Sequence, residues 1–216
     1  MDNLSISLGK RQLVDSIWKS AGIEGLGTTF PDTQKILDNM PTNTTYEEAC
    51  FITNMKRAWY FIFDNIEHPN NLSFLREVNK ICMAGLSYDA GNIRNIPVSI
   101  GGTSWRPDLP QEGVLIEGIA RVDNIADKLE CALEMFCFIA RSQMFLDGNK
   151  RVAQLLCNKI MMENDLGIFS IPYDRIDAFS YKLIGFYETG ESGEIKHFFK
   201  NECLLLNYNN PAVNLL

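Results

Sequence analysis

Apolar residues recur with the spacing of an α-helix along most of the chain, and this periodicity constrains the fold more than any other feature. Leu13, Ile17 and Ala21 fall on one side of a helix that we expect from Leu8 to about Ala21. The stretch 133–139 is apolar nearly all round, which is typical of a central, buried helix. The 216 residues therefore predict a mainly α-helical domain that is long enough to bury a sizeable core.

Capping patterns divide the rest of the chain into further helices. Pro31 fits the first turn of a short helix that runs to Asp38, and Thr45 with Glu48 fits a capping box ahead of a longer one. Asn71 is a candidate N-cap for the next helix. The remaining helices are expected from Asp123 through Phe145, from near Asn149, from Arg175 to Thr189, and from Glu194 to Leu206, with a short extended piece at 167–172.

The segment 89–111 differs in composition from its helical neighbours, because it is rich in glycine and proline. Within it, Ile96, Val98 and Ile100 alternate with other residues, which predicts a short strand that Pro97 confines to an edge. An edge strand offers unpaired backbone groups to a partner. The segment is therefore either a surface hairpin between helices or a peptide-docking edge, and the pattern leaves both open.

Charge and composition exclude several classes of protein. The net charge of −7 argues against a protein that binds nucleic acid by neutralising phosphates. No apolar run is long enough to span a bilayer, and residues 1–3 do not begin a signal peptide. The six cysteines form no C-x-x-C pair and lie mostly in apolar helical patterns, so we expect buried reduced thiols and a cytoplasmic protein.

One charged, glycine-containing stretch, Asp147-Gly148-Asn149-Lys150-Arg151, interrupts two strongly apolar runs. Gly148 permits a tight turn and Asn149 is a good N-cap, so the free N–H groups of the new helix point into the turn and favour an anion. Lys150 and Arg151 add two cations there, and Asp147 can hold a divalent cation beside a phosphate. These parts predict a site for a magnesium-bound polyphosphate. Alternatively, Asp147 caps the helix and both cations pair with surface acids.

The motif Phe145-x-Asp147-Gly148-Asn149-Lys150-Arg151 resembles the signature of the Fic/Doc (Fido) family, His-x-Phe-x-Asp/Glu-Gly/Ala-Asn-Gly/Lys-Arg. The resemblance covers roughly residues 45 to 205. It implies the Fic (Fido) fold, a helical bundle with a small β-hairpin flap. The flap would comprise Val98, Ser99, Ile100, Gly101, Gly102 and Thr103.

A second motif supports this resemblance. Ser20-Ala-Gly-Ile-Glu24-Gly matches the family's inhibitory pattern Ser/Thr-x-x-x-Glu-Gly/Asn, and its serine and glutamate share a helix face. By resemblance, 1–40 is an N-terminal segment with an inhibitory helix and 41–216 is the Fic domain. The alternative is that Glu24 is a solvated residue at a helix end.

The family typically transfers AMP from ATP to a hydroxyl group of a target protein. By resemblance, Phe145 anchors the loop and Asp147 binds Mg²⁺. Gly148, Asn149 and the backbone of Lys150 cradle the phosphates, which Arg151 bonds directly. The flap would hold the target protein by strand addition.

Two residues depart from the family pattern. The family's catalytic histidine corresponds to Gln143, which cannot act as a base near neutral pH. A second arginine of many adenylyltransferases, which contacts the γ-phosphate and pairs with the inhibitory glutamate, corresponds to Gln154. The two histidines, His68 and His197, lie far away in sequence, and a lone helical histidine is more often structural.

Three functions follow from these features. The first is an auto-inhibited AMP transferase of low activity. The second, favoured by Gln143 and Gln154, is a nucleotide-binding pseudoenzyme that recognises a partner protein through the flap. The third is a Doc-like phosphotransferase, to which Lys150 points, because glycine is usual there in adenylyltransferases. The sequence leaves the oligomeric state open, a homo-oligomer included.

Overall fold

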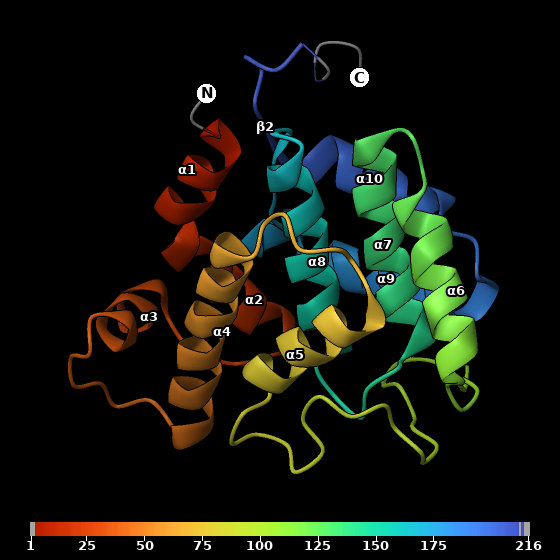
Figure 1. Cartoon of the computed structure of the whole chain (residues 1–216). Helices are drawn as coiled ribbons and strands as arrows, with labels where there is room; N and C mark the ends of the chain where they lie inside the picture. Colours follow the sequence, from red (N-terminus) through yellow and green to blue (C-terminus); the bar gives the residue numbers. More distant parts are fainter. Residues whose placement is uncertain (1–2, 212, 214–216) are drawn as a thin grey trace.

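The computed structural model describes residues 3–211 and 213, and they form a helical bundle with one small sheet (Figure 1). The centre of the bundle is the pair α7 (Lys128–Ser142) and α8 (Asn149–Glu163), which pack against each other along their lengths. Nearly every residue of α8 is buried, from Asn149 to Met162. The predicted mainly α-helical architecture is confirmed.

The other helices surround this pair. Helices α4 and α5 pack against α8, α6 packs against α7, and α10 packs against both α7 and α9. Their bounds are α1 Leu4–Arg11, α2 Leu13–Ile23, α3 Phe30–Leu37, α4 Tyr46–Asp64, α5 Leu72–Cys82, α6 Glu112–Asp123, α9 Ile176–Thr189 and α10 Gly193–Glu202, with a 3-10 turn at Tyr173–Arg175.

Three predicted helix starts are confirmed, two of them by the hydrogen bonds of the predicted cap. Pro31 lies in the first turn of α3 as predicted, and the cap of this helix is Thr29. The Thr45 side chain and Glu48 form the reciprocal capping box of α4. The Asn71 side chain accepts from the backbone N–H of Phe74 at the start of α5. These starts were predictable because a capping motif is local and does not depend on the rest of the fold.

Other boundaries differ from prediction. The single helix expected from Leu8 is two helices, which meet at Gln12 and have different partners: α1 lies against α8 and the sheet, and α2 against α4. The helix expected from Asp123 begins at Lys128, because Asp127 caps it and Asp123 instead ends α6, which was not predicted. The sequence signal for α6 is weak, since Val114 and Ile116 are exposed.

The sheet pairs two short strands from distant parts of the chain. Strand β1 (Gly167–Phe169) runs antiparallel to β2 (Leu204–Leu206). The prediction of a helix as far as Leu206 was therefore wrong in its last turn, because pairing with β1 ends α10 at Glu202. Gly167 is required there, since its φ is 114° and a Cβ would lie 2.0 Å from the Leu205 carbonyl oxygen.

The flap segment forms no regular strand in the described part of the chain. Val98 and Ile100 are half-buried and Ser99 is exposed, but Ile96 is exposed as well, so the predicted alternation holds only from Val98 onward and produces no ladder. A turn follows at Gly101 and Gly102, where Gly102 has a φ of 81°. The edge strand predicted there is thus not formed.

The long connection after α5 and the α7–α8 turn lie at the same end of the bundle, at the bottom of Figure 1, and β2 lies at the opposite end. This arrangement brings the flap segment and the charged loop to one face of the molecule. No helix in the described part of the chain is long and apolar enough to cross a lipid bilayer.

Candidate functional site

The loop between α7 and α8 turns sharply because two of its residues have positive φ. Gln143 ends α7 with a φ of 44°, and Gly148 precedes α8 with a φ of 82°. A Cβ on residue 148 would lie 2.9 Å from Asn79 Nδ2 and from Met83 Sδ, so only glycine fits. Asn79 also donates to the Asp147 carbonyl oxygen at 2.9 Å, which ties the loop to α5.

Asn149 has a different role from the predicted one. Gly148 occupies the N-cap position of α8, and Asn149 is the first helical residue. Its side chain instead closes the loop from inside: Oδ1 accepts from the N–H of Phe145 at 3.0 Å, and Nδ2 donates to the Phe145 carbonyl and to Gln143 Oε1. The Phe145 ring is buried beneath the loop. The loop is therefore held in shape from both sides before any ligand is present.

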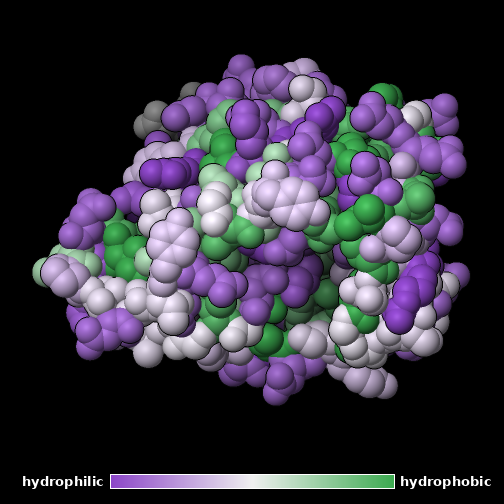
Figure 2. All heavy atoms as spheres, turned by 90° about the horizontal axis from the view of Figure 1, so that it is seen from below, coloured by the Kyte–Doolittle hydropathy of each residue, from purple (hydrophilic) through white to green (hydrophobic). Residues whose placement is uncertain are grey.

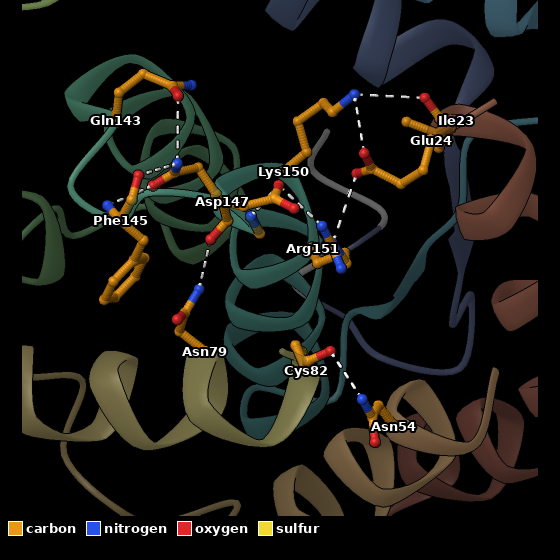
Figure 3. A network of polar contacts seen from close by, with 12 residues as sticks. Ile23, Glu24, Asn54, Asn79, Cys82, Gln143, Phe145, Asp147, Lys150 and Arg151 are labelled. Atoms are coloured by element: carbon orange, nitrogen blue, oxygen red, sulfur yellow. Dashed lines mark hydrogen bonds and ion pairs between the residues drawn. The ribbon is translucent and has the colours of Figure 1, made fainter. Parts of the chain in front are cut away.

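The charged side chains of the loop face the end of α2 (Figure 3). Arg151 lies between two carboxylates, with Nη2 2.9 Å from Asp147 Oδ1 and Nε 3.8 Å from Glu24 Oε1. Lys150 Nζ lies 3.4 Å from Glu24 Oε2 and donates to the Ile23 carbonyl at 3.4 Å. Glu24, predicted as inhibitory, thus meets both cations of the loop, and it is a half-buried residue rather than a solvated one.

The electrostatics of Arg151 follow from its position. Its side chain is 5% exposed. Burial lowers the pKa of its guanidinium, but the charges of Glu24 and Asp147 outweigh burial and hold the pKa above the ordinary value. Arg151 Nε and Glu24 Oε1 are nevertheless buried and without a hydrogen bond, because 3.8 Å is too long for one. A buried donor without an acceptor is unfavourable, and this one faces the Glu24 carboxylate at a distance too long for a hydrogen bond.

Ser20, the serine of the motif that resembles the inhibitory pattern, contacts Gln154, the second residue that departs from the family pattern. Ser20 Oγ donates to Gln154 Oε1 at 3.1 Å, and Gln154 Nε2 donates to the Lys150 carbonyl. Glu24 makes no contact with Gln154 in the described structure; it pairs with Lys150 and Arg151 instead. Gln154 therefore holds α2 against α8 through the serine, where the resemblance implied a contact through the glutamate.

A pocket of about 420 Å³ joins the predicted parts. Its wall includes Glu24, the flap residues 98–101, and Gln143, Asp147, Asn149 and Lys150 from the loop. Figure 2 views the face that carries this loop and shows hydrophilic and hydrophobic residues interspersed there. The end of α2, the flap and the charged loop, which are far apart in sequence, thus border one cavity.

Helix α9 completes the pocket, and sequence reasoning missed its contribution. Phe179, Ser180, Leu183, Ile184 and Tyr187 line the wall opposite the loop. The Tyr187 side chain is buried, which raises the pKa of its hydroxyl well above the ordinary value. Its hydroxyl oxygen accepts from Gln143 Nε2 at 3.4 Å. The helical periodicity of α9 predicts which residues face inward, but it cannot tell a core from a pocket.

The Gln143 side chain is engaged on both ends of its amide. Its Nε2 donates to the Ala140 carbonyl at 2.7 Å as well as to Tyr187, and its Oε1 accepts from Asn149 at 3.2 Å. Neither histidine replaces it: His68 stacks on Phe74 in the turn after α4, and His197 contacts Asn201 on α10. Neither lines the pocket.

The geometry defines a class of protein: a helical domain in which a charged loop precedes the buried helix α8 and borders the same pocket as the flap. Residues 69–161 match the model of the Fic/DOC family. With the motif and the fold, this match places residues 69–161 in the Fic/DOC family. No curated protein sequence matches the chain.

Solved structures of Fic proteins share the fold. Fic-1 of C. elegans (residues 134–508) has a TM-score of 0.73 at 19% identity, covering 90% of this chain and 61% of that one. A Fic domain containing signaling protein of Bacteroides thetaiotaomicron has 0.74 at 17%, covering 92% and 84%. A Fic family protein of Desulfovibrio desulfuricans has 0.73 at 15%, covering 91% and 63%. The chain thus spans about 61% of the length of the C. elegans protein fragment.

Proposed function

We propose that the chain binds Mg²⁺-ATP in the pocket and transfers AMP to a hydroxyl group of a target protein, with Glu24 as a built-in competitor of the nucleotide. The observation that carries the proposal is the pocket itself, where Glu24, the flap and the charged loop meet. Residues 1–40 would then be the inhibitory segment and 41–216 the catalytic domain.

The residues present fit a magnesium-bound polyphosphate. The backbone N–H groups of residues 149–151 have no hydrogen-bond partner in the described structure, and they stand at the positive end of α8. Arg151 Nε is a buried donor that lacks an acceptor. The Asp147 side chain is 59% exposed and can turn an oxygen towards a metal ion, which would supply neutralisation of phosphate charge.

Inhibition follows from the same contacts. Glu24 offers one carboxylate to two cations, at distances of 3.4 and 3.8 Å. A polyphosphate carries more charge and more acceptor oxygens, so it can pair with Arg151 and the N–H groups at hydrogen-bond distance. Binding therefore requires α2 to release Glu24 from these cations.

The chemistry would rest on positioning rather than on a strong base. The flap aims the target hydroxyl, and Gln143 can orient it once the glutamine amide leaves Tyr187 or Asn149. Without a general base, transfer is expected to be about 10²- to 10⁴-fold slower than with one. Low activity is thus part of the proposal.

A second candidate is a nucleotide-binding pseudoenzyme that recognises a partner protein through the flap. The network around Gln143 favours it, since every donor direction and the oxygen of that amide already have a structural partner. In this case the loop would bind a nucleotide as a ligand and the flap would dock a protein without modifying it.

The test measures label transfer to proteins of a cell lysate from α-³²P-ATP and, in parallel, from γ-³²P-ATP, with Mg²⁺. The variants are wild type, Glu24→Gly, Gln143→His and Gln143→His with Asp147→Asn as the matched negative control. We expect α-label transfer by Glu24→Gly above wild type. Transfer from the γ position alone would replace the proposal with Doc-like phosphotransfer, and labelling only by Gln143→His would favour the pseudoenzyme. Absence of Mg²⁺-ATP binding to both wild type and Glu24→Gly by calorimetry would refute both candidates.

A further inference from the structure

A fully buried arginine, Arg94, joins the flap segment to the α7–α8 loop. Its side chain is 2% exposed, and its guanidinium donates to four backbone carbonyl oxygens. These are Gln143 at 2.6 Å through Nε, Ile96 at 2.8 Å through Nη1, and Asp108 at 2.6 Å and Pro107 at 3.5 Å through Nη2. The backbone N–H of Arg94 also donates to the Met144 carbonyl at 3.0 Å.

These carbonyl groups belong to three parts of the chain: the residues before the flap, the residues after it, and the α7–α8 loop. Ile96 lies where the chain enters the flap, Pro107 and Asp108 lie where it leaves, and Gln143 is the loop residue at the position of the family's histidine. One rigid, planar group therefore fixes both ends of the flap and the loop relative to one another. A lysine could not reproduce this, because its donors radiate from a single nitrogen.

Burial of this charge has no compensating acid in the described structure, since no carboxylate lies within ion-pair distance of Arg94. Burial lowers the pKa of its guanidinium, with the nearby charge of Asp108 acting the other way. Backbone carbonyl dipoles take the place of a counter-ion. A buried cation solvated only by carbonyls is an unfavourable choice for stability alone, which indicates a role beyond packing.

The loop residue that Arg94 binds is strained. Gln143 has a φ of 44°, a conformation that residues with a Cβ seldom adopt. Its carbonyl accepts the Arg94 Nε–H, while its side chain donates to the Tyr187 hydroxyl, and the Tyr187 ring stacks on Trp105 of the flap segment at 5.6 Å. Gln143 is thus connected to the flap segment through both its backbone and its side chain.

We propose that Arg94 is a positioning residue that sets the flap at a fixed distance from residue 143, so that a segment docked on the flap presents its hydroxyl to the loop. This inference rests on the proposed function for its catalytic consequence, but the coupling of flap and loop does not. Arg94 does not itself line the pocket; it reaches the pocket only through the backbone carbonyl of Gln143, which is part of the wall.

The experiment compares Arg94→Lys and Arg94→Gln with Arg76→Gln. Arg76 is a matched control because it also donates to a backbone carbonyl in the same connection, that of Gly91, but contacts neither the flap nor the loop. Hydrogen–deuterium exchange is followed in residues 96–108 and 143–147, with α4 as the internal reference. For Arg94→Gln we expect exchange at least tenfold faster in both segments and unchanged in α4. Arg94→Lys should recover part of the protection and Arg76→Gln should leave both segments as in wild type.

Two results would overturn the inference: exchange that rises equally in α4, which would make Arg94 a general stabilising residue, or protection of either segment that stays at the wild-type level. If Arg94→Gln does not fold, Arg94→Lys alone decides between these outcomes. A second readout uses the Glu24→Gly background, where Arg94→Lys should lower protein labelling about tenfold while the Kd for Mg²⁺-ATP stays within about threefold. Failure of wild type and Glu24→Gly to bind Mg²⁺-ATP would refute the proposed function and leave the exchange result on Arg94 standing.

Discussion

Two clusters of charged side chains each join helices that are distant in sequence, and they are built differently. In the first, which we call the α7–α10 clamp, Lys196 of α10 lies 2.5 Å from Glu130 and 2.8 Å from Glu134 of α7. In the second, the Glu24 cluster, the carboxylate of Glu24 lies 3.4 Å from Lys150 and 3.8 Å from Arg151. The clamp is made of hydrogen-bonded ion pairs, whereas the Glu24 cluster leaves a buried donor and a buried acceptor without hydrogen bonds.

The two clusters differ in whether oppositely charged groups that attract each other also form hydrogen bonds. In the clamp, burial lowers the pKa of Lys196, but hydrogen bonds and charges from both glutamates outweigh it and raise the pKa well above the ordinary value. The protonated form of Lys196 is thus specifically held. The Glu24 cluster has opposite charges close together but poor hydrogen-bond geometry, so a ligand with better-placed oxygens can replace the carboxylate. The clamp is therefore held by complete hydrogen bonds, whereas the Glu24 cluster is held by charge alone.

Breaking the clamp should give the largest effect on stability. Lys196→Met leaves two glutamates on α7 without their shared cation, and we expect it to lower the free energy of unfolding by about 1–3 kcal/mol, discounted for partial exposure. Urea denaturation of wild type and variant measures this. Lys200→Met is the control, because Lys200 is half-exposed and pairs only with Glu130 at 3.1 Å; its loss should be below about 1 kcal/mol. Equal losses in both variants would contradict the special role of Lys196.

Breaking the Glu24 cluster should change stability less and ligand binding more. Glu24→Gln keeps the shape of the side chain but removes the charge that competes with phosphate. We expect the free energy of unfolding to change by less than about 1 kcal/mol and the affinity for Mg²⁺-ATP to rise about tenfold. Calorimetric titration and urea denaturation together check both parts. A loss of stability as large as that of Lys196→Met, with no gain in affinity, would make the two clusters equivalent.

Acid should weaken the clamp, which gives a smaller and graded effect. Burial raises the pKa of Glu130, but Lys196 and Lys200 outweigh it, so the folded-state pKa lies below the ordinary 4.5. A depressed carboxyl pKa contributes stability that is present above pH 4.5 and is lost as the pH falls through the folded-state pKa. Between pH 7 and 3 the wild type should therefore lose more stability than Lys196→Met does. Parallel unfolding curves for the two proteins across this range would show that Glu130 is not held by Lys196.

The comparison also shows how far local signals reach. Thr45 and Asn71 were predicted as helix starts and are, because each cap is complete within four residues. The prediction that the last helix continues to Leu206 was wrong at its end. Residues 204–206 pair with β1, a strand that lies far away in sequence. The same limit applies to Asn149, whose side chain bonds Phe145 and Gln143 rather than capping α8. A residue with several hydrogen-bonding options takes the one that the tertiary structure provides.

The residues of the candidate site likewise fall into those that the sequence predicts and those that only the folded structure reveals. The loop motif, including the departures at Gln143 and Gln154, can be read from the sequence, since its residues are consecutive or one helical turn apart. Tyr187 and Arg94 could not be found in this way, because no local sequence pattern marks them. Their contacts with Gln143 exist only in the folded protein. The pairing of Glu24 with Lys150 and Arg151, rather than with residue 154, likewise depends on how α2 rests on α8.

By itself the sequence determined a helical domain with a charged turn before a buried helix, because periodicity, capping and a glycine turn are local properties of the chain; the Fic family followed from the resemblance of its motif. Only the tertiary structure decided that Glu24, the flap and α9 enclose one pocket with that turn, and that a buried arginine joins flap and loop. The physical reason is that contacts between distant segments form through packing of the whole core, which no short stretch of sequence encodes.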